Sequence, residues 1–99
     1  MKIALVQMDV AHGQPVENKK HVIEMLERAL DDNHDVIVLP EMWNTGYALN
    51  ELDGLADKDG LDSQELLSHF ARKHAVAIIG GSVAIEKDGK FYNTTYVYN

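Results

Sequence analysis

The fold is predicted outward from one run of residues, Val36-Ile37-Val38-Leu39-Pro40-Glu41. Its four consecutive apolar residues favour a strand that is covered on both faces, because a strand with one solvated face alternates apolar and polar side chains. Pro40 has no N–H group and therefore ends ladder pairing where the strand exits. Glu41 comes next, so the sequence places a carboxylate at the carboxyl end of a buried strand, where ligands gather in open α/β sheets.

The segments on either side of this strand predict the order strand, helix, strand, loop, helix, hairpin. Val22 and Leu26 recur at helical spacing, and Pro15 suits the first position of a helix, where its missing N–H costs nothing. The Asp88-Gly89 pair predicts a tight hairpin turn. The expected elements are a strand at 2–8, a helix at 16–30, the strand at 36–39, a loop at 42–62, a helix with Ser63 as its N-cap, a strand at 76–79, and a hairpin whose second strand covers 91–98.

This order predicts an α/β layer architecture, because parallel strands joined through helices need helices packed on the sheet. The strands are apolar on both sides, yet the sequence offers only two helices. The aromatic strand at 91–98 would also be an aggregation-prone edge in a free-standing domain. We therefore expect residues 1–99 to form an incomplete domain with one uncovered sheet face.

Composition excludes several classes of function. The net charge of −7 opposes binding to nucleic acid, since that binding is driven by neutralising phosphates. The longest apolar runs are too short to span a bilayer, and no secretory signal is recognisable at the start, so we expect a cytoplasmic protein without membrane contact. The chain contains no cysteine, which rules out a disulfide framework and a cysteine nucleophile within these residues.

No metal or cofactor is expected from the sequence. The five histidines include no pair at the i, i+4 spacing of a zinc site on a helix. A calcium loop aligned on Gly60 would place Leu55 and Leu66 at ligand positions, and neither can coordinate an ion. Gly80-Gly81 is not followed by the Lys-Ser or Lys-Thr of a phosphate-binding loop, so these glycines favour close backbone packing instead.

The loop after the central strand holds the candidate site residues. Glu41 is the candidate general base, and partial burial would raise its pKa toward the working pH. Position alone leaves open that Glu41 merely begins a surface loop. Trp43 and Tyr47 flank Gly46, where two roles are open for them: walls of a small-molecule pocket, or cover for the end of the core.

The order and spacing of these motifs resemble the N-terminal portion of the carbon–nitrogen hydrolase (nitrilase) superfamily, nearest its omega-amidase-like branch. The Leu-Pro-Glu box followed by Gly-Tyr is the most specific part of the resemblance. The matching segments are Gln7-Met8, Asn18, residues 35–41, Gly46-Tyr47, Ala71, residues 76–82 and Tyr92-Asn93-Thr94.

The resemblance implies a four-layer α-β-β-α sandwich of which residues 1–99 are the N-terminal portion of a single domain. It also implies hydrolysis of non-peptide C–N bonds in small amides or nitriles, amides being favoured, by a Glu-Lys-Cys triad without a cofactor. Glu41 matches the family's glutamate, and the lysine and cysteine fall beyond Asn99 in family order. The family commonly forms homo-oligomers, which we expect of the full-length protein.

Two hypotheses follow from the sequence. In the first, the chain is part of an amidase in which Glu41 is the base, although the 99 residues alone are expected to be inactive. In the second, it is a catalytically inactive fragment or an interaction module of the same fold, associating through its unpaired aromatic strand. A glycosidase is disfavoured, because no second carboxylate pairs with Glu41 in the sequence.

Overall fold

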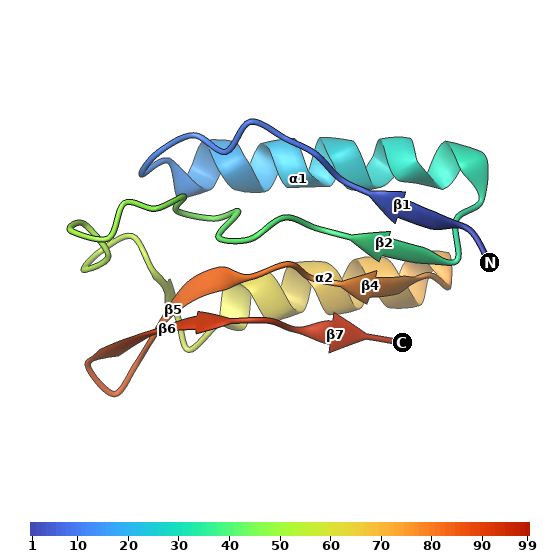
Figure 1. The fold of residues 1–99 in the computed structure, drawn as a ribbon. Coiled ribbons are helices and arrows are strands. Elements are labelled where there is room, and N and C mark those ends of the chain that lie inside the picture. The colour runs from blue at the N-terminus through green and yellow to red at the C-terminus, as the bar shows by residue number, and fades with distance from the viewer.

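The computed structural model describes residues 1–99, apart from the side chain of Asp32. Two helices and seven strands make up the chain, with α1 between the first two strands of the main sheet and α2 before the third (Figure 1). The elements are β1 (Ile3–Leu5), α1 (Pro15–Ala29), the 3₁₀ turn η1 (Leu30–Asp32), β2 (Val36–Val38), β3 (Asp57–Lys58), α2 (Leu61–His74), β4 (Ala77–Ile79), β5 (Val83–Lys87), β6 (Lys90–Thr94) and β7 (Val97–Tyr98).

The main sheet has the strand order β1-β2-β4-β7. Strands β1, β2 and β4 are parallel, and Ile37 at the centre of β2 lies opposite Ala4 on one side and Ile78 on the other. Strand β7 closes the sheet antiparallel to β4. A smaller sheet with the order β3-β5-β6 continues from the end of the main one. The apolar run that precedes Glu41 thus forms an inner strand of the main sheet, between β1 and β4.

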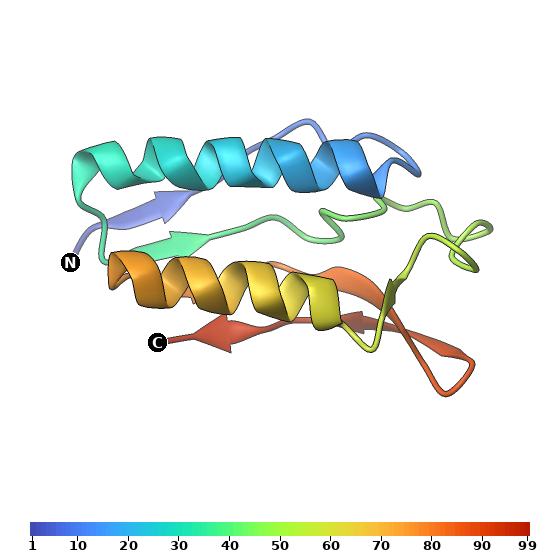
Figure 2. The same cartoon turned by 180° about the vertical axis from the view of Figure 1, so that it is seen from behind.

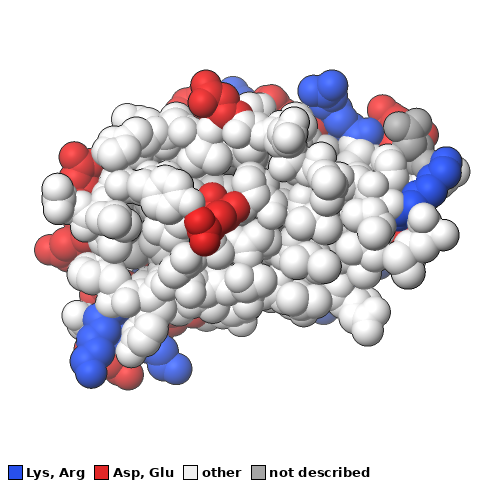
Figure 3. All heavy atoms as spheres, in the orientation of Figure 1, with Lys and Arg blue, Asp and Glu red and all other residues white. Residues whose placement is uncertain are grey.

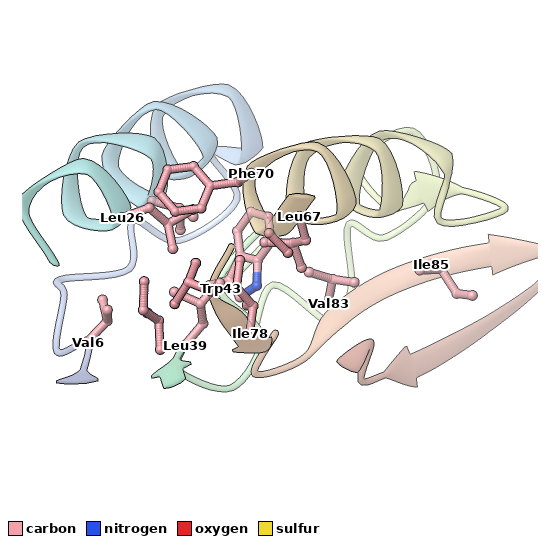
Figure 4. Close-up of a cluster of buried hydrophobic side chains, with 13 residues drawn as sticks. Val6, Leu26, Leu39, Trp43, Leu67, Phe70, Ile78, Val83 and Ile85 are labelled. Atoms are coloured by element: carbon pink, nitrogen blue, oxygen red, sulfur yellow. The ribbon is translucent and has the colours of Figure 1, made fainter. Parts of the chain in front are cut away.

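Helices α1 and α2 lie side by side on one face of the main sheet (Figures 1 and 2). Helix α1 buries Asn18, Val22 and Leu26, which stand four residues apart and therefore share one face. Helix α2 contributes Leu67 and Phe70 to the same layer, and the core between helices and sheet is shown in Figure 4. Burial of these side chains is the main source of the fold's stability.

The opposite face of the main sheet is open. It exposes Ile3 by 53%, Leu5 by 73%, Ile79 by 40% and Val97 by 64%. Figure 3 shows that this side of the molecule is broadly uncharged, with acidic atoms standing alone near its middle. The expected uncovered apolar face is therefore confirmed.

Two strands are shorter in the structure than the sequence predicts. The first covers only β1 rather than residues 2–8, and the aromatic strand predicted at 91–98 is divided into β6 and β7. The division has a physical reason: β6 pairs with β5 in the small sheet and β7 pairs with β4 in the main one. The backbone must therefore turn at Thr95 and Tyr96 to pass from one sheet to the other.

The prediction that Ser63 caps the second helix is also wrong. Helix α2 begins at Leu61 after Gly60, which has a φ of +66°. The first-turn N–H groups of Asp62 and Ser63 donate to the Asp57 carboxylate at 3.2 and 2.7 Å. Sequence pattern missed this cap because the carboxylate reaches the helix from β3, outside the usual N-cap position.

Gly80 and Gly81 follow β4 in the chain, and Gly81 packs against the backbone at the exit of β2. At Gly81, where φ is +59°, a Cβ atom would lie 2.0 Å from the carbonyl oxygen of Pro40. At Gly80 it would lie 2.7 Å from the carbonyl oxygen of Tyr96. Both positions accept only glycine, which confirms the prediction that these residues allow close backbone packing.

We expect Gly81→Ala to reduce the free energy of unfolding by about 3 kcal/mol, because the new Cβ meets a backbone oxygen as well as an unfavourable φ. Gly89→Ala is the matched control: its φ is +76°, yet nothing lies within 4 Å of the added Cβ. Its expected cost is about 1 kcal/mol. Urea unfolding followed by the fluorescence of Trp43 measures both variants, and equal losses would show that the close contact contributes nothing.

Candidate functional site

Glu41 stands at the edge of the main sheet where the carboxyl ends of three parallel strands meet. Strand β2, which leads to it, lies between β1 and β4. Pairing continues one residue past β2, through the N–H of Leu39 and the carbonyl of Ile79 at 2.9 Å, and the chain then enters a turn at residues 41–47. This is the position at which open α/β sheets bind ligands.

The carboxylate of Glu41 is exposed, so the predicted partial burial is wrong for the described chain. Proline ends the strand at Pro40, and the turn that follows leaves the acidic side chain facing solvent. The residues on either side of Glu41 are less exposed to solvent: Pro40 is half-buried, and Met42 is 4% exposed. The site therefore combines a fixed backbone with an accessible acidic group.

Tyr47 is the side-chain partner of Glu41. The Tyr47 hydroxyl donates a hydrogen bond to Oε1 of Glu41. The turn makes this contact possible: the N–H of Gly46 donates to the carbonyl of Met42 at 2.8 Å, and Gly46 has a φ of +62°. The Tyr47 ring also lines an open hollow of about 300 Å³. A role in substrate binding stays a prediction for this residue.

The contact with Glu41 changes the acidity of the Tyr47 hydroxyl. The pKa of Tyr47 is raised, first by the hydrogen bond to Glu41, then by desolvation, and last by the negative charge of the carboxylate. All three favour the protonated phenol. Tyr47 therefore remains a hydrogen-bond donor to Glu41 throughout the neutral pH range.

Trp43 belongs to the core and is only 2% exposed. Its indole lies among the side chains between α2 and the sheet, near Leu67 and Ile78 (Figure 4). The indole N–H donates to the carbonyl of Gly80 at 2.9 Å. Trp43 therefore packs in the core, as the second of its two predicted roles requires. It also lines a hollow of about 250 Å³ with Asn44 and Asp57, so a role in substrate binding stays a prediction for this residue.

Two asparagines hold the turn against other elements: Asn44 binds β5, and Asn18 ties the turn to α1. The side chain of Asn44 donates to the carbonyl of Ala84 and accepts from its N–H, both at 2.9 Å. Asn18 of α1 donates to the carbonyl of Asn44 at 2.8 Å. Nothing local in the sequence signals the partner of Asn44, because Ala84 lies 40 residues away.

Ser82 contacts the Glu41 segment, although the sequence assigned it no role there. Its hydroxyl accepts the N–H of Met42 at 2.9 Å, and its own N–H donates to the carbonyl of Pro40 at 3.2 Å. Ser82 thus contacts the backbone on both sides of Glu41. The only signal in the sequence was its place directly after Gly80-Gly81.

The described residues contain no group of three or more His, Asp and Glu side chains arranged to hold a metal ion. Neither α1 nor α2, the helices of the described chain, has the length and apolar character needed to cross a membrane.

The helix-covered parallel sheet, with a carboxylate at the exit of its central strand, defines an α/β protein of the nitrilase-like fold. Nit3 of Saccharomyces cerevisiae, a member of branch 10 of the nitrilase superfamily, superposes with a TM-score of 0.84 at 26% identity. The alignment covers 100% of this chain and 40% of that one. The helix layer and sheet layer described above are two layers of the α-β-β-α sandwich.

The carbon–nitrogen hydrolase family model matches residues 2–99, and the chain belongs to this family. It is 46% identical to the 2-oxoglutaramate amidase of Bacillus subtilis (strain 168) over 96 residues, which are 96% of this chain and 36% of the relative. It is 33% identical to omega-amidase NIT2-B of Xenopus laevis over 97 residues, which are 98% of this chain and 35% of the relative. The chain thus spans about a third of the length of these curated relatives.

We expect Glu41→Gln to lower the pKa of Tyr47 toward the ordinary tyrosine value of about 10, because the neutral amide removes the charge that favours the protonated phenol. NMR titration of ¹³C-labelled tyrosine rings measures this change. Tyr98 is the internal control, since its pKa is raised by burial alone and is expected not to move. An unchanged Tyr47 titration would contradict the hydrogen bond.

Proposed function

We propose that this chain supplies the general base, Glu41, of a carbon–nitrogen hydrolase that acts on small linear amides. The observation that carries the proposal is the placement of Glu41: an accessible carboxylate at the carboxyl end of the central strand, held through Oε1 by Tyr47. One carboxylate oxygen is oriented by the protein, and the exposed side chain leaves Oε2 accessible to a reacting group.

The chemistry requires a base at this position because a thiol attacks as the thiolate and is mostly protonated at neutral pH. In the proposed reaction Glu41 accepts the proton of a cysteine thiol, whose sulfur attacks the amide carbonyl. The proton then passes to the leaving amine as the C–N bond breaks, which leaves an acyl-enzyme for water to hydrolyse. The described chain has no cysteine. In this proposal the nucleophile, and the oxyanion-stabilising lysine that the family resemblance implies, come from outside residues 1–99.

The proposed substrate class follows from the relatives. The Bacillus subtilis protein at 46% identity is a 2-oxoglutaramate amidase, and the Xenopus laevis protein is an omega-amidase. Both names describe hydrolysis of an amide rather than a nitrile. We propose the same class for the full-length protein that contains residues 1–99, with 2-oxoglutaramate as the first compound to test.

We expect Glu41→Gln in the full-length protein to reduce kcat for ammonia release from 2-oxoglutaramate by about 100- to 10,000-fold, the range for removal of a general base. Glu27→Gln is the matched control, because Glu27 is an exposed glutamate on α1 outside the site. Its activity is expected to stay within about twofold of wild type, as is usual for a surface substitution.

Full activity after Glu41→Gln would remove the assigned role from Glu41. Wild-type protein that releases no ammonia from any of a panel of linear amides would instead favour the second hypothesis, an interaction module. The open face with Leu5 and Val97 is the feature that supports that alternative.

A further inference from the structure

Ser82 is hydrogen-bonded to the backbone on both sides of Glu41. Its N–H donates to the carbonyl oxygen of Pro40 at 3.2 Å, and its Oγ accepts the N–H of Met42 at 2.9 Å. The carbonyl of Ser82 also accepts the N–H of Trp43 at 3.1 Å. A single residue therefore makes three hydrogen bonds to the segment that carries the catalytic candidate.

The first two bonds matter most because of which peptide groups they reach. The Pro40 oxygen belongs to the peptide before the Cα of Glu41, and the Met42 nitrogen belongs to the peptide after it. Each peptide is a rigid plane, so φ and ψ of Glu41 are set by the orientations of these two planes. By holding both, Ser82 determines the direction in which the Glu41 side chain leaves the backbone.

The hydroxyl has no substitute in this arrangement. Met42 is 4% exposed and Ser82 is 6% exposed, so water has little access to the Met42 N–H. Met42 also has a φ of +51°, which a non-glycine residue adopts only when its surroundings enforce it. Removing Oγ would leave a buried N–H without its partner beside a strained residue.

Neighbouring contacts secure other parts of the turn. The indole N–H of Trp43 donates to Gly80, and the amide of Asn44 pairs with Ala84. Both act after Met42, so they retain the turn while the peptide between Glu41 and Met42 becomes free to rotate. Loss of the Ser82 hydroxyl should therefore change the direction of the Glu41 side chain more than it changes the stability of the fold.

Gly81 explains why serine reaches this position. Its φ of +59° and missing side chain let the backbone pass so close to β2 that a Cβ would lie 2.0 Å from the Pro40 oxygen. The next residue then presents its N–H and its hydroxyl together to the Glu41 segment.

We propose that Ser82 is a positioning residue for Glu41, acting through the two peptide groups that flank it. The inference rests on the proposed function for its effect on catalysis, but the orientation of Glu41 has a readout of its own. That readout is the hydrogen bond from Tyr47, which forms only when the carboxylate points toward residue 47.

The test compares Ser82→Ala with Ser63→Ala in the full-length protein. Ser63 of α2 is a matched control, because it is 4% exposed and, within the described residues, its hydroxyl makes no hydrogen bond to residues 40–43. For Ser82→Ala we expect kcat for 2-oxoglutaramate to fall about 10- to 100-fold, the scale of a catalytic group misplaced by about 1 Å, with KM within about threefold. Ser63→Ala should leave both constants within about twofold of wild type.

The same variants are examined by NMR titration of labelled tyrosine rings. In Ser82→Ala, the pKa of Tyr47 should fall as it does in Glu41→Gln, although neither Tyr47 nor Glu41 is altered. Ser63→Ala should leave it unchanged. A protein without amidase activity would overturn the proposed function, whereas this titration would still decide whether Ser82 orients Glu41.

An unchanged Tyr47 titration and kcat in Ser82→Ala would overturn the inference, and so would equal losses of kcat in the two alanine variants. Should Ser82→Ala fail to fold, Ser82→Cys replaces it, because sulfur is a poorer acceptor of similar size. The cysteine variant should show a smaller drop in kcat and a partial fall in the pKa of Tyr47. Wild-type values for both would refute the positioning role.

Discussion

The close approach of Gly80-Gly81-Ser82 to the exit of β2 is the constraint on which the site depends. Gly80 donates its N–H to Tyr96 at 2.8 Å and accepts the indole N–H of Trp43 at 2.9 Å. Ser82 bonds on both sides of Glu41. Residues 80–82 thus join the start of β7, the core and the proposed base, so the position of Glu41 is tied to the packing of the whole sheet.

The two faces of the main sheet have different roles. Helices α1 and α2 bury one face and are linked at their outer surface by an exposed Lys19–Asp62 ion pair at 2.7 Å, which adds little stability. The other face presents Leu5, Ile79 and Val97 to solvent. In the α-β-β-α sandwich that the fold defines, such a face packs on a second sheet, and its apolar side chains contribute to stability only when that packing exists.

Much of this structure was predictable because apolar patterning reports burial directly. The run at 36–39 identified the central strand, and the spacing of Val22 and Leu26 identified α1. The wrong predictions of the α2 cap and of the last strand have a common cause, since a contact with another strand decides each of them. The cap of α2 comes from the Asp57 carboxylate of β3, and the break between β6 and β7 reflects pairing with two sheets.

The site shows the same division. Glu41 became a candidate through its position after an apolar strand and a proline, both of which are local signals, and its role as a base was implied by the family resemblance. The partners of its segment, Ser82 and Tyr47, are set by backbone geometry: a positive φ at Gly81 and a turn closed by Gly46. No single-sequence pattern states which hydroxyl will meet which amide, because hydrogen-bond partners in loops are fixed by tertiary structure.

Glu41 is exposed, yet its backbone is already fixed by hydrogen bonds within residues 1–99. Its conformation therefore does not depend on what covers the carboxyl ends of the strands. Buried hydrogen bonds determine the φ and ψ of Glu41, and these bonds lie within residues 1–99. The dielectric environment of the carboxylate is a separate property, set by whatever covers the strand ends. Excluding water there would strengthen the Tyr47 hydrogen bond and any interaction of the second carboxylate oxygen with a thiol. For the base that we propose, orientation is thus encoded by residues 1–99, whereas reactivity depends on what covers the strand ends.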